Sequence, residues 1–366
     1  MFNSKRTVRR LGLLVISIIG VIMVLDFILQ KKELRHVARS DQALSSRSLE
    51  DQERNHTKEP ALMINEMKKI VSETEDNDTS GRINEQLMHE RTEHVRNKCK
   101  YLGLGNANAL PPMSDYIVVD EKFKVVYCMV PKIASTSWTK LFLSQHLTTP
   151  YQNITWQTWH KTWRKYMKEL HRYPMNERIK ILQSYTKFMF VRDPLDRIVS
   201  AFKNKFTFKG KSNQKEYEWY GKAYGKAIVK KYRKNPTLRS LQDGLGITFE
   251  EFIQYITNDA PHKDEHWKSV YLLCHPCDIN YDYIGNFYDA TNESNFILNR
   301  IHLETIKFPS ENVLTKNGGF GVNGTKLKYA YQKIPKSTLS KLEYLYEKDY
   351  ALFSEDFHFK KVTGLL

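Results

Sequence analysis

One stretch, residues 124–147, limits the possible folds more than any other part of the chain. Its sequence is KVVYCMVPKIASTSWTKLFLSQHL. The apolar run Val125–Val130, bounded by charge and by a proline, predicts a buried strand of an α/β sheet. A helix is predicted to follow, with Ser135, Thr136 or Ser137 as its N-cap. Its apolar positions are Trp138, Leu141, Phe142 and Leu147.

The segment between this strand and helix carries groups that bind oxyanions. A lysine, three hydroxyls and the free amides of a helix N-terminus together suit phosphate or sulfate oxygens. The residues of this oxyanion loop are Pro131, Lys132, Ile133, Ala134, Ser135, Thr136 and Ser137. It has no glycine and its lysine precedes the hydroxyls, so it is not a Walker A loop and nucleoside triphosphate hydrolysis is disfavoured. An ordinary strand-to-helix turn is the alternative.

A second junction of the same kind spans residues 185–206, YTKFMFVRDPLDRIVSAFKNKF. Phe188–Val191 is predicted to be a short strand, and Asp193 before a proline predicts the start of a helix. Arg192 follows the strand, while Arg197 and Ser200 lie on the helix, so we expect the three side chains to converge on one anion. The alternative is a surface pair of Asp193 with Arg197 and a serine without a role.

The first 97 residues differ in composition from the rest. Residues 11–29 are mostly apolar and follow a tail, residues 1–10, with four basic side chains. This pattern predicts a cytosolic tail and an uncleaved transmembrane signal anchor, with a cleaved signal peptide as the competitor. Residues 30–97 are polar and almost without aromatics, which predicts a disordered lumenal stem. Glycosylation sequons, which agree with a lumenal location, begin at Asn55, Asn77, Asn153, Asn292 and Asn323.

Residues 98–366 are predicted to form one large domain, because they hold all 21 Tyr and all six Trp and no repeat or linker divides them. The chain has 57 Lys and Arg against 41 Asp and Glu, and the basic runs lie in this region. This excess favours an acidic partner. In the lumen, that partner is a sulfated or uronic-acid polysaccharide and not a nucleic acid.

Four cysteines allow disulfides in the lumen, and the sequence does not rank their three possible pairings. They are Cys99, Cys128, Cys274 and Cys277. The segment CHPC at residues 274–277 looks like half of a zinc knuckle. A second such pair is missing, so we predict no metal.

Two oxyanion-binding junctions in a basic lumenal domain resemble the membrane-bound carbohydrate sulfotransferases. Residues 130–138, VPKIASTSW, look like the 5′-phosphosulfate loop of that family, and residues 191–202, VRDPLDRIVSAF, look like its 3′-phosphate motif. The blocks EHW, LCHPC and YDYIG within residues 265–285, and residues 342–353, resemble the group that sulfates chondroitin, dermatan and terminal glucuronyl glycans. The resemblance covers residues 99–355. Ser135 and Ser137 depart from this group, where cysteine and asparagine are common.

The resemblance implies a P-loop-NTPase-like sulfotransferase fold of the α/β class, with a central parallel sheet flanked by helices. It implies a single-pass type II Golgi membrane protein that uses 3′-phosphoadenosine 5′-phosphosulfate and no metal. The implied acceptor is the 4-position of N-acetylgalactosamine in chondroitin, with dermatan or terminal glucuronic acid as alternatives. The oligomeric state stays open.

The resemblance also assigns roles to single residues. Lys132 and the oxyanion loop are expected to bind the 5′ side of the donor and to stabilise the leaving group. Arg192 and Ser200 are expected to clamp the 3′-phosphate. The whole 3′-phosphate motif comprises Arg192, Asp193, Pro194, Leu195, Asp196, Arg197, Ile198, Val199 and Ser200. As the base that accepts the proton of the acceptor hydroxyl, we favour His160 over His266.

Two other functions fit part of the pattern. A type II glycosyltransferase shares the anchor, the stem and the lumenal domain, but its Asp-x-Asp motif occurs only at residues 76–78, in the predicted stem. A non-catalytic glycan-binding protein would keep the fold and the basic surface, yet it has no need of Lys132, Arg192 and Ser200. Binding of the sulfuryl donor distinguishes these possibilities.

Overall fold

The computed structural model describes residues 85–105, 114–309, 324–357 and 359. The predicted tail and anchor, residues 1–29, lie outside these ranges, as do most of the predicted stem and Asn55, Asn77 and Asn323. In the part of the chain that is described, no helix has both the length and the apolar character that a membrane crossing requires. Asn153 and Asn292 are exposed, as glycosylation requires.

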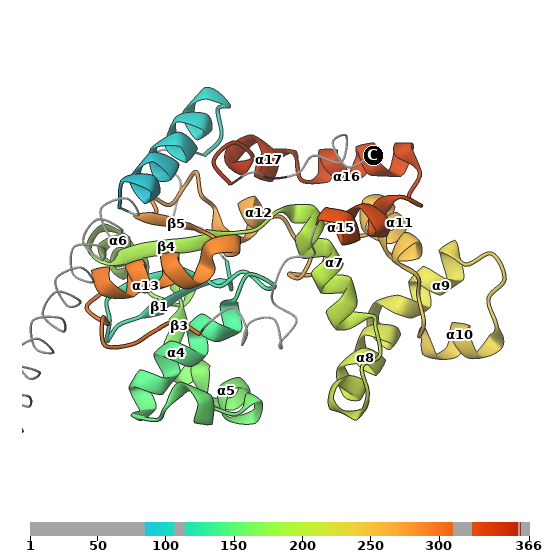
Figure 1. The fold of residues 1–366 in the computed structure, drawn as a ribbon, viewed down its shortest axis with the longest axis horizontal. Coiled ribbons are helices and arrows are strands. Elements are labelled where there is room, and N and C mark those ends of the chain that lie inside the picture. Colours follow the sequence, from blue (N-terminus) through green and yellow to red (C-terminus); the bar gives the residue numbers. More distant parts are fainter. Residues whose placement is uncertain (1–84, 106–113, 310–323, 358, 360–366) are drawn as a thin grey trace, which may run out of the picture. The chain divides into compact units, whose positions relative to one another are not determined.

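A five-stranded sheet in the order β3-β1-β2-β4-β5 forms the centre of the fold (Figure 1). The strands are β1 (Ile117–Asp120), β2 (Val125–Cys128), β3 (Met167–Glu169), β4 (Thr186–Val191) and β5 (Tyr283–Asn286). β2, β4 and β5 run parallel, whereas β1 is antiparallel to both β2 and β3. The predicted parallel sheet is thus confirmed for β2, β4 and β5 and corrected at β1, because a short turn joins β1 to β2 and only antiparallel strands can be joined in that way.

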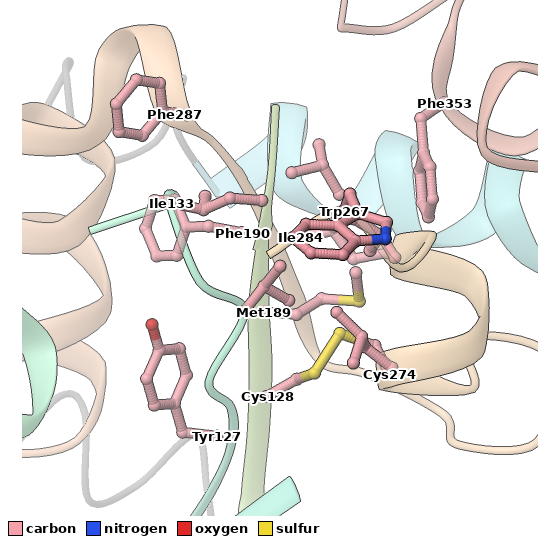
Figure 2. Packing of buried hydrophobic residues seen from close by; sticks show 14 of the residues in the cluster. Tyr127, Cys128, Ile133, Met189, Phe190, Trp267, Cys274, Ile284, Phe287 and Phe353 are labelled. Carbon is pink, nitrogen blue, oxygen red and sulfur yellow. A yellow bond between two sulfur atoms is a disulfide. The ribbon is translucent and has the colours of Figure 1, made fainter. Parts of the chain in front are cut away.

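The two predicted strands alternate their side chains between the faces of the sheet. Figure 2 shows Tyr127 and Phe190 on one side of β4, and Cys128 and Met189 on the other. Trp138 packs on the first face, with its ring centroid 5.9 Å from those of Tyr127 and Phe190. Both faces are therefore buried, as expected for strands that form apolar runs without polar alternation.

Helices cover both faces and continue beyond the sheet, with α7 leading from the end of β4 toward α8, α9, α10 and α11 (Figure 1). Their bounds are α4 (Ser135–Leu147), α5 (Trp156–Thr162), α6 (Met175–Ser184), α7 (Pro194–Lys205), α8 (Gln214–Tyr220), α9 (Lys226–Tyr232), α10 (Leu238–Asp243), α11 (Phe249–Asn258), α12 (Val270–Cys274), α13 (Ala290–Arg300), α15 (Gly324–Tyr331), α16 (Lys336–Leu345) and α17 (Glu347–Phe353). A π-helix, Gly221–Gly225, joins α8 to α9.

Residues 85–101 form a helix, although we predicted a disordered stem up to residue 97. Met88 and Val95 on this helix are each 1% exposed. Arg91 forms a buried ion pair with Glu293 of α13, with 2.8 Å between Nη1 and Oε1. The stem prediction is wrong for residues 85–97, because the partners that cover this helix come from distant parts of the chain.

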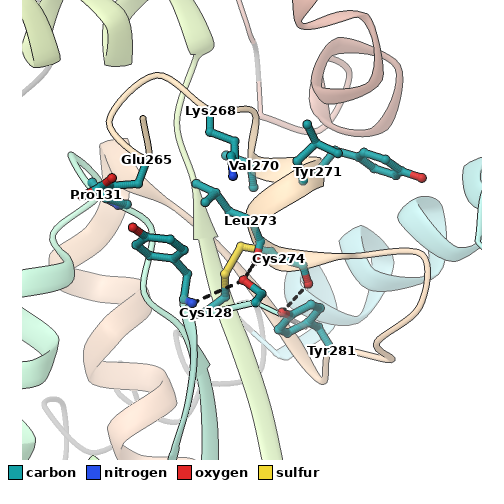
Figure 3. Close-up of a disulfide and its surroundings, with 12 residues drawn as sticks. Cys128, Pro131, Glu265, Lys268, Val270, Tyr271, Leu273, Cys274 and Tyr281 are labelled. Atoms are coloured by element: carbon teal, nitrogen blue, oxygen red, sulfur yellow. Dashed lines mark hydrogen bonds between the residues drawn. A yellow bond between two sulfur atoms is a disulfide. The ribbon is translucent and has the colours of Figure 1, made fainter. Parts of the chain in front are cut away.

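Two disulfides, Cys99–Cys277 and Cys128–Cys274, decide among the three pairings. The first ties the helix of residues 85–101 to the segment after α12. The second joins the end of β2 to the end of α12, and Figure 3 shows it beside Tyr281, whose hydroxyl donates to the carbonyl of Cys274 at 2.7 Å. Both cysteines of the CHPC segment are therefore in disulfides and not available as zinc ligands.

Residues 342–353, the C-terminal block, hold the start of α12 in position. The carboxylate of Asp349 in α17 accepts hydrogen bonds from the amides of Val270 and Tyr271, at 2.9 and 2.8 Å. The hydroxyl of Tyr346 donates to the carbonyl of Trp267. Burial raises the pKa of Asp349 to about 6. The predicted resemblance of residues 342–353 thus coincides with a structural contact to the segment 264–274.

We predict that replacing Cys128 and Cys274 together by alanine lowers the free energy of unfolding by about 3–5 kcal/mol. The bridge joins cysteines 146 residues apart and so restricts the unfolded chain strongly. Urea unfolding followed by tryptophan fluorescence, with the oxidised wild type as reference, measures the loss. An unchanged transition midpoint would contradict the prediction.

Candidate active site

The carboxyl ends of β2, β4 and β5 meet at one edge of the sheet, because these strands are parallel. Arg192 directly follows β4, and Phe287 directly follows β5. The guanidinium carbon of Arg192 lies 4.3 Å from the centroid of the Phe287 ring. Its Nη1 donates to the carbonyl of Lys132 at 2.6 Å. The two predicted junctions are therefore in direct contact.

The oxyanion loop has an unusual backbone. Lys132 and Ala134 have positive φ angles of 70° and 55°, a conformation that costs a residue other than glycine about 1–2 kcal/mol. Ala134 is also the N-cap of α4, so the prediction that Ser135, Thr136 or Ser137 holds this position is wrong. The amides of Ser135 and Thr136 precede the first bond of the helix, which Ser137 makes to the carbonyl of Ala134. Such amides are suited to binding an oxyanion.

Positive charge gathers beside this loop. Burial is the largest cause that lowers the pKa of Lys132 from 10.5 to about 7, and nearby Lys205, Arg192 and Lys209 lower it further. Glu216 acts in the opposite direction and forms an ion pair with Lys205. A bound anion would offset this repulsion and restore the charge of Lys132.

Two buried polar atoms at the second junction have no hydrogen-bond partner among the described residues. Arg192 is held by Asp196, which accepts from its Nε at 3.1 Å, and by the carbonyl of Lys132. Within the described residues, its Nη2 and the hydroxyl of Ser200 are buried without a hydrogen-bond partner. Buried donors are nearly always satisfied, so these two atoms are candidate ligands, and the predicted 3′-phosphate clamp stays a prediction.

Arg197 lies in a different place from the one we predicted. Its side chain is buried, and its three nitrogens donate to the carbonyls of Pro131, Lys268 and Glu265, at 3.0, 2.5 and 2.6 Å. Figure 3 shows these three residues around the Cys128–Cys274 disulfide. Arg197 is therefore neither an exposed partner on the helix surface nor directed at an anion together with Ser200. It fastens the oxyanion loop to the segment around residue 265.

The other positions of the second motif shape the junction. Asp193 is the N-cap of α7 and accepts from the amide of Leu195 at 2.9 Å, as predicted. Asp196 also accepts from the hydroxyl of Tyr288 at 2.9 Å, so it orients Arg192. The buried residues that pack α7 against the core are Pro194, Leu195, Ile198 and Val199. The motif thus contains two candidate phosphate ligands, Arg192 and Ser200, and its other residues cap α7 or pack it against the core.

The two candidate bases differ in their surroundings. His160, which we favoured, is exposed on α5, where its ring packs 5.4 Å from that of Trp156. The side chain of His266 is 14% exposed, and its Nδ1 lies 2.8 Å from an oxygen of Asp264. That contact assigns the proton of the neutral ring to Nδ1 and leaves Nε2 as a proton acceptor.

The electrostatic environment of His266 favours its neutral form. Burial is the largest cause that lowers its pKa, and Lys205 lowers it further, whereas the hydrogen bond with Asp264 raises it. Lys205 affects the pKa of Lys132 as well. The ammonium of Lys205 therefore acts on both Lys132 and His266, although these two residues are distant in the sequence.

One cluster has the spacing of a metal site. The ligand atoms of Asp264, Glu265 and His266 lie within 4.8 Å of one another. Both oxygens of Asp264 already accept hydrogen bonds, from His266 on one side and from Tyr224 on the other. The absence of a metal at this cluster stays a prediction.

Sequence reasoning missed several residues of this site. Asp264 immediately precedes the block EHW, and its position two residues before a histidine was an available signal. No sequence pattern indicated that Phe287 or Lys205 belongs to the site. Their proximity to Arg192 and to Lys132 depends on how the strands and helices pack.

Exposed basic side chains follow α7 along the chain. The exposed lysines between residues 203 and 234 are Lys203, Lys209, Lys211, Lys215, Lys222, Lys226, Lys230, Lys231 and Lys234. Trp219 in the same segment is 55% exposed. Exposed lysines favour an acidic partner, and an exposed tryptophan can offer an aromatic face to a sugar ring.

Comparisons with known proteins agree with this geometry. The profile of the sulfotransferase family matches residues 115–356. Carbohydrate sulfotransferase 11 of Rattus norvegicus is 36% identical over 203 residues, which cover 53% of this chain and 55% of the relative. Carbohydrate sulfotransferase 9 of Homo sapiens is 33% identical over 241 residues, 64% of this chain and 52% of the relative. Carbohydrate sulfotransferase 14 of Danio rerio is 29% identical over 285 residues, 75% of this chain and 74% of the relative.

The chain spans about half the length of the first two of these relatives. No solved structure matches it. The family profile covers both junctions, the segment with Asp264 and His266, and the C-terminal block that holds α12. On this evidence the chain belongs to the sulfotransferase family.

Proposed function

We propose that this protein transfers a sulfuryl group from 3′-phosphoadenosine 5′-phosphosulfate to a hydroxyl of a glycosaminoglycan. The observation that carries the proposal is that Arg192 Nη2, on a residue bonded to the oxyanion loop, and Ser200 Oγ on α7 are both buried without a hydrogen-bond partner among the described residues. A 3′-phosphate supplies acceptor oxygens for both atoms. That phosphate also distinguishes this donor from ordinary adenine nucleotides.

The oxyanion loop would hold the other end of the donor. The amides of Ser135 and Thr136 would donate to oxygens of the 5′-phosphosulfate, and Lys132 would place its ammonium on the leaving phosphate as negative charge builds there. The bond between Arg192 and the carbonyl of Lys132 fixes the loop relative to the 3′-phosphate clamp. The two ends of the donor site are therefore positioned together.

His266 is the base that this geometry favours. Nδ1 is held by Asp264, so Nε2 is free to take the proton of the attacking sugar hydroxyl, and the carboxylate stabilises the imidazolium that results. His160, exposed on α5, lacks such an orienting carboxylate among the hydrogen bonds of the described residues.

The acceptor that we propose is chondroitin, at the 4-position of N-acetylgalactosamine. Dermatan and terminal glucuronic acid are the alternatives. The exposed lysines of residues 203–234 support an acidic polysaccharide, because Lys209 of this set also lies near Lys132. The matched relatives are carbohydrate sulfotransferases by name, which agrees with a glycan acceptor.

We also propose a lumenal location in the Golgi, with residues 11–29 as a type II membrane anchor. Two disulfides in the described domain favour an oxidising compartment. The exposed Asn153 and Asn292 are accessible to glycosylation there.

If Arg192 and Ser200 clamp the 3′-phosphate, changing either residue should strongly affect only nucleotides that carry this phosphate. Ser200→Ala should weaken binding of adenosine 3′,5′-bisphosphate about tenfold and Arg192→Lys about tenfold to a hundredfold, since each removes a charge-assisted hydrogen bond. Ser200→Ala should not weaken binding of adenosine 5′-monophosphate, which lacks the 3′-phosphate, and Arg192→Lys should weaken it less than binding of the bisphosphate, through loss of its bond to the carbonyl of Lys132. Isothermal titration calorimetry measures both affinities.

Ser294→Ala is the matched control for Ser200→Ala. The hydroxyl of Ser294 is likewise buried without a partner among the described residues, but it lies on α13. This variant should bind both nucleotides as the wild type does. Equal losses for the two nucleotides in Ser200→Ala and Arg192→Lys would show that the clamp does not hold the 3′-phosphate.

The lowered pKa of Lys132, about 7, predicts a pH-dependent affinity. Above pH 7 the free protein loses the ammonium, whereas the bound nucleotide raises the pKa and restores it. Affinity for adenosine 3′,5′-bisphosphate should therefore fall between pH 7 and pH 9, by up to about tenfold per pH unit. In Lys132→Arg the charge persists over this range, so the dependence should disappear. Equal wild-type affinities at pH 7 and pH 9 would refute this assignment.

The function itself is tested by sulfate transfer from labelled donor to desulfated chondroitin, dermatan, heparosan and a glucuronyl-terminated oligosaccharide. Disaccharide analysis should find the label in 4-sulfated N-acetylgalactosamine from chondroitin. Chelation with EDTA should leave the rate unchanged. Label on another acceptor would keep the enzyme class and change the substrate, and failure to bind the bisphosphate would refute the class.

The same assay compares the candidate bases. His266→Ala should lower the rate at least tenfold, and His160→Ala should not, because general-base catalysis contributes about a hundredfold or more. Lys132→Ala and Arg192→Ala should abolish transfer while the protein stays folded. Full activity in His266→Ala would place the base elsewhere.

A further inference from the structure

Two tyrosines converge on the carboxylate that holds His266. The hydroxyl of Tyr224 donates to Oδ2 of Asp264 at 3.0 Å, and that of Tyr220 lies 3.5 Å from the same oxygen. The hydroxyl of Tyr220 is also 3.2 Å from Nδ1 of His266. The other oxygen, Oδ1, accepts from the backbone amide and from Nδ1 of His266, at 2.9 and 2.8 Å. Each oxygen of Asp264 thus has its own set of donors.

A π-helix brings these tyrosines to Asp264. Tyr220 precedes the π-helix Gly221–Gly225 and Tyr224 lies within it. The wider turn of a π-helix places both rings on the same side, and short π-helical segments inside α-helices occur often at functional sites. The ring centroids of the two tyrosines are 5.7 Å apart.

Glycine contacts hold this π-helix in place. A Cβ at Gly225 would lie 1.9 Å from the carbonyl oxygen of Gly244, so any larger residue would force the two segments apart. Gly244 is the C-cap of α10, with a φ angle of 70°, and a Cβ there would lie 2.2 Å from the carbonyl oxygen of Gly221. The positions of Tyr220 and Tyr224 are therefore fixed by backbone packing and not by local helix propensity.

We propose that Tyr224 is a positioning residue that fixes the carboxylate of Asp264 and, through it, the tautomer and the basicity of His266. This proposal rests on the proposed role of His266 as the base. The hydroxyl of Tyr224 holds Oδ2 and prevents rotation of the carboxylate, so Oδ1 stays directed at Nδ1 of His266. Nε2 then keeps its lone pair for the acceptor hydroxyl.

The hydrogen bond from Tyr224 also reduces the stabilisation that Asp264 gives to protonated His266. A carboxylate that accepts an additional hydrogen bond is a weaker acceptor. The groups that face His266 are Asp264 and Glu265 from its own segment, Tyr220 from α8 and Lys205 from α7. None of these changes in Tyr224→Phe, which removes one hydroxyl and keeps the ring. The pKa of His266 should therefore rise in this variant.

The first test is an NMR titration of the full-length chain with ¹⁵N-labelled histidine. The His266 signal is assigned by its loss in His266→Asn. In Tyr224→Phe, we expect the midpoint of His266 to move to higher pH, because Asp264 then becomes a stronger acceptor for Nδ1. An unchanged or lower midpoint would overturn the proposal. Because this readout needs no substrate, it holds even if the sulfotransferase proposal fails.

The second test compares kinetics with a matched control. Tyr232→Phe removes a hydroxyl on α9 that donates to Asp259 at 2.7 Å, away from His266. Tyr224→Phe should lower kcat about tenfold, leave the KM of the donor unchanged and move the acid limb of the pH profile to higher pH. Tyr232→Phe should change none of these. A loss of activity in Tyr224→Phe with an unmoved acid limb would assign this tyrosine to acceptor binding and overturn the proposal.

Discussion

The guanidinium of Arg197 donates to the carbonyls of Pro131, Lys268 and Glu265, and so joins the oxyanion loop to the segment that carries the candidate base. A buried carbonyl without a donor costs about 1–3 kcal/mol, so these bonds also satisfy a backbone that forms neither helix nor strand at these points. Two arginines near the start of α7 therefore have separate contacts. Arg192, just before the helix, bonds to Asp196 and to the oxyanion loop, and Arg197, within it, holds the surrounding backbone.

Around this frame, the site combines groups that are unfavourable in the absence of a ligand. Lys132 and Ala134 have left-handed backbones, and Arg192 and Ser200 have buried atoms without partners among the described residues. Lys132, Arg192 and Lys205 repel one another in a partly buried region. The unpartnered donors and the repulsion on Lys132 are the costs that a bound anion would reduce, as the proposed function requires.

The local elements of the site follow from sequence. The strand at Phe188–Val191, the N-cap Asp193 and the start of α7 lie where the pattern of apolar, capping and proline residues predicts them. The pattern failed where partners are distant in sequence. The helix of residues 85–101 is covered by α13 and by a disulfide, and the N-cap of α4 is an alanine in a strained loop, which no capping preference predicts. The choice between His160 and His266 stays a prediction, because Asp264, Lys205 and Tyr224 meet only in the folded chain.

The sequence by itself determined that two strand-to-helix junctions would follow apolar strands, one with a lysine and hydroxyls and one with an arginine, because strand ends, caps and helix starts are decided by residues close together in the chain. Only the tertiary structure decided which side chains have free donors, which are already paired, and which histidine has a carboxylate beside it. Burial, hydrogen-bond satisfaction and pKa depend on the surrounding atoms of several elements. The physical reason is that residue spacing limits what a segment can form, whereas desolvation and contact geometry depend on the packing of the whole domain.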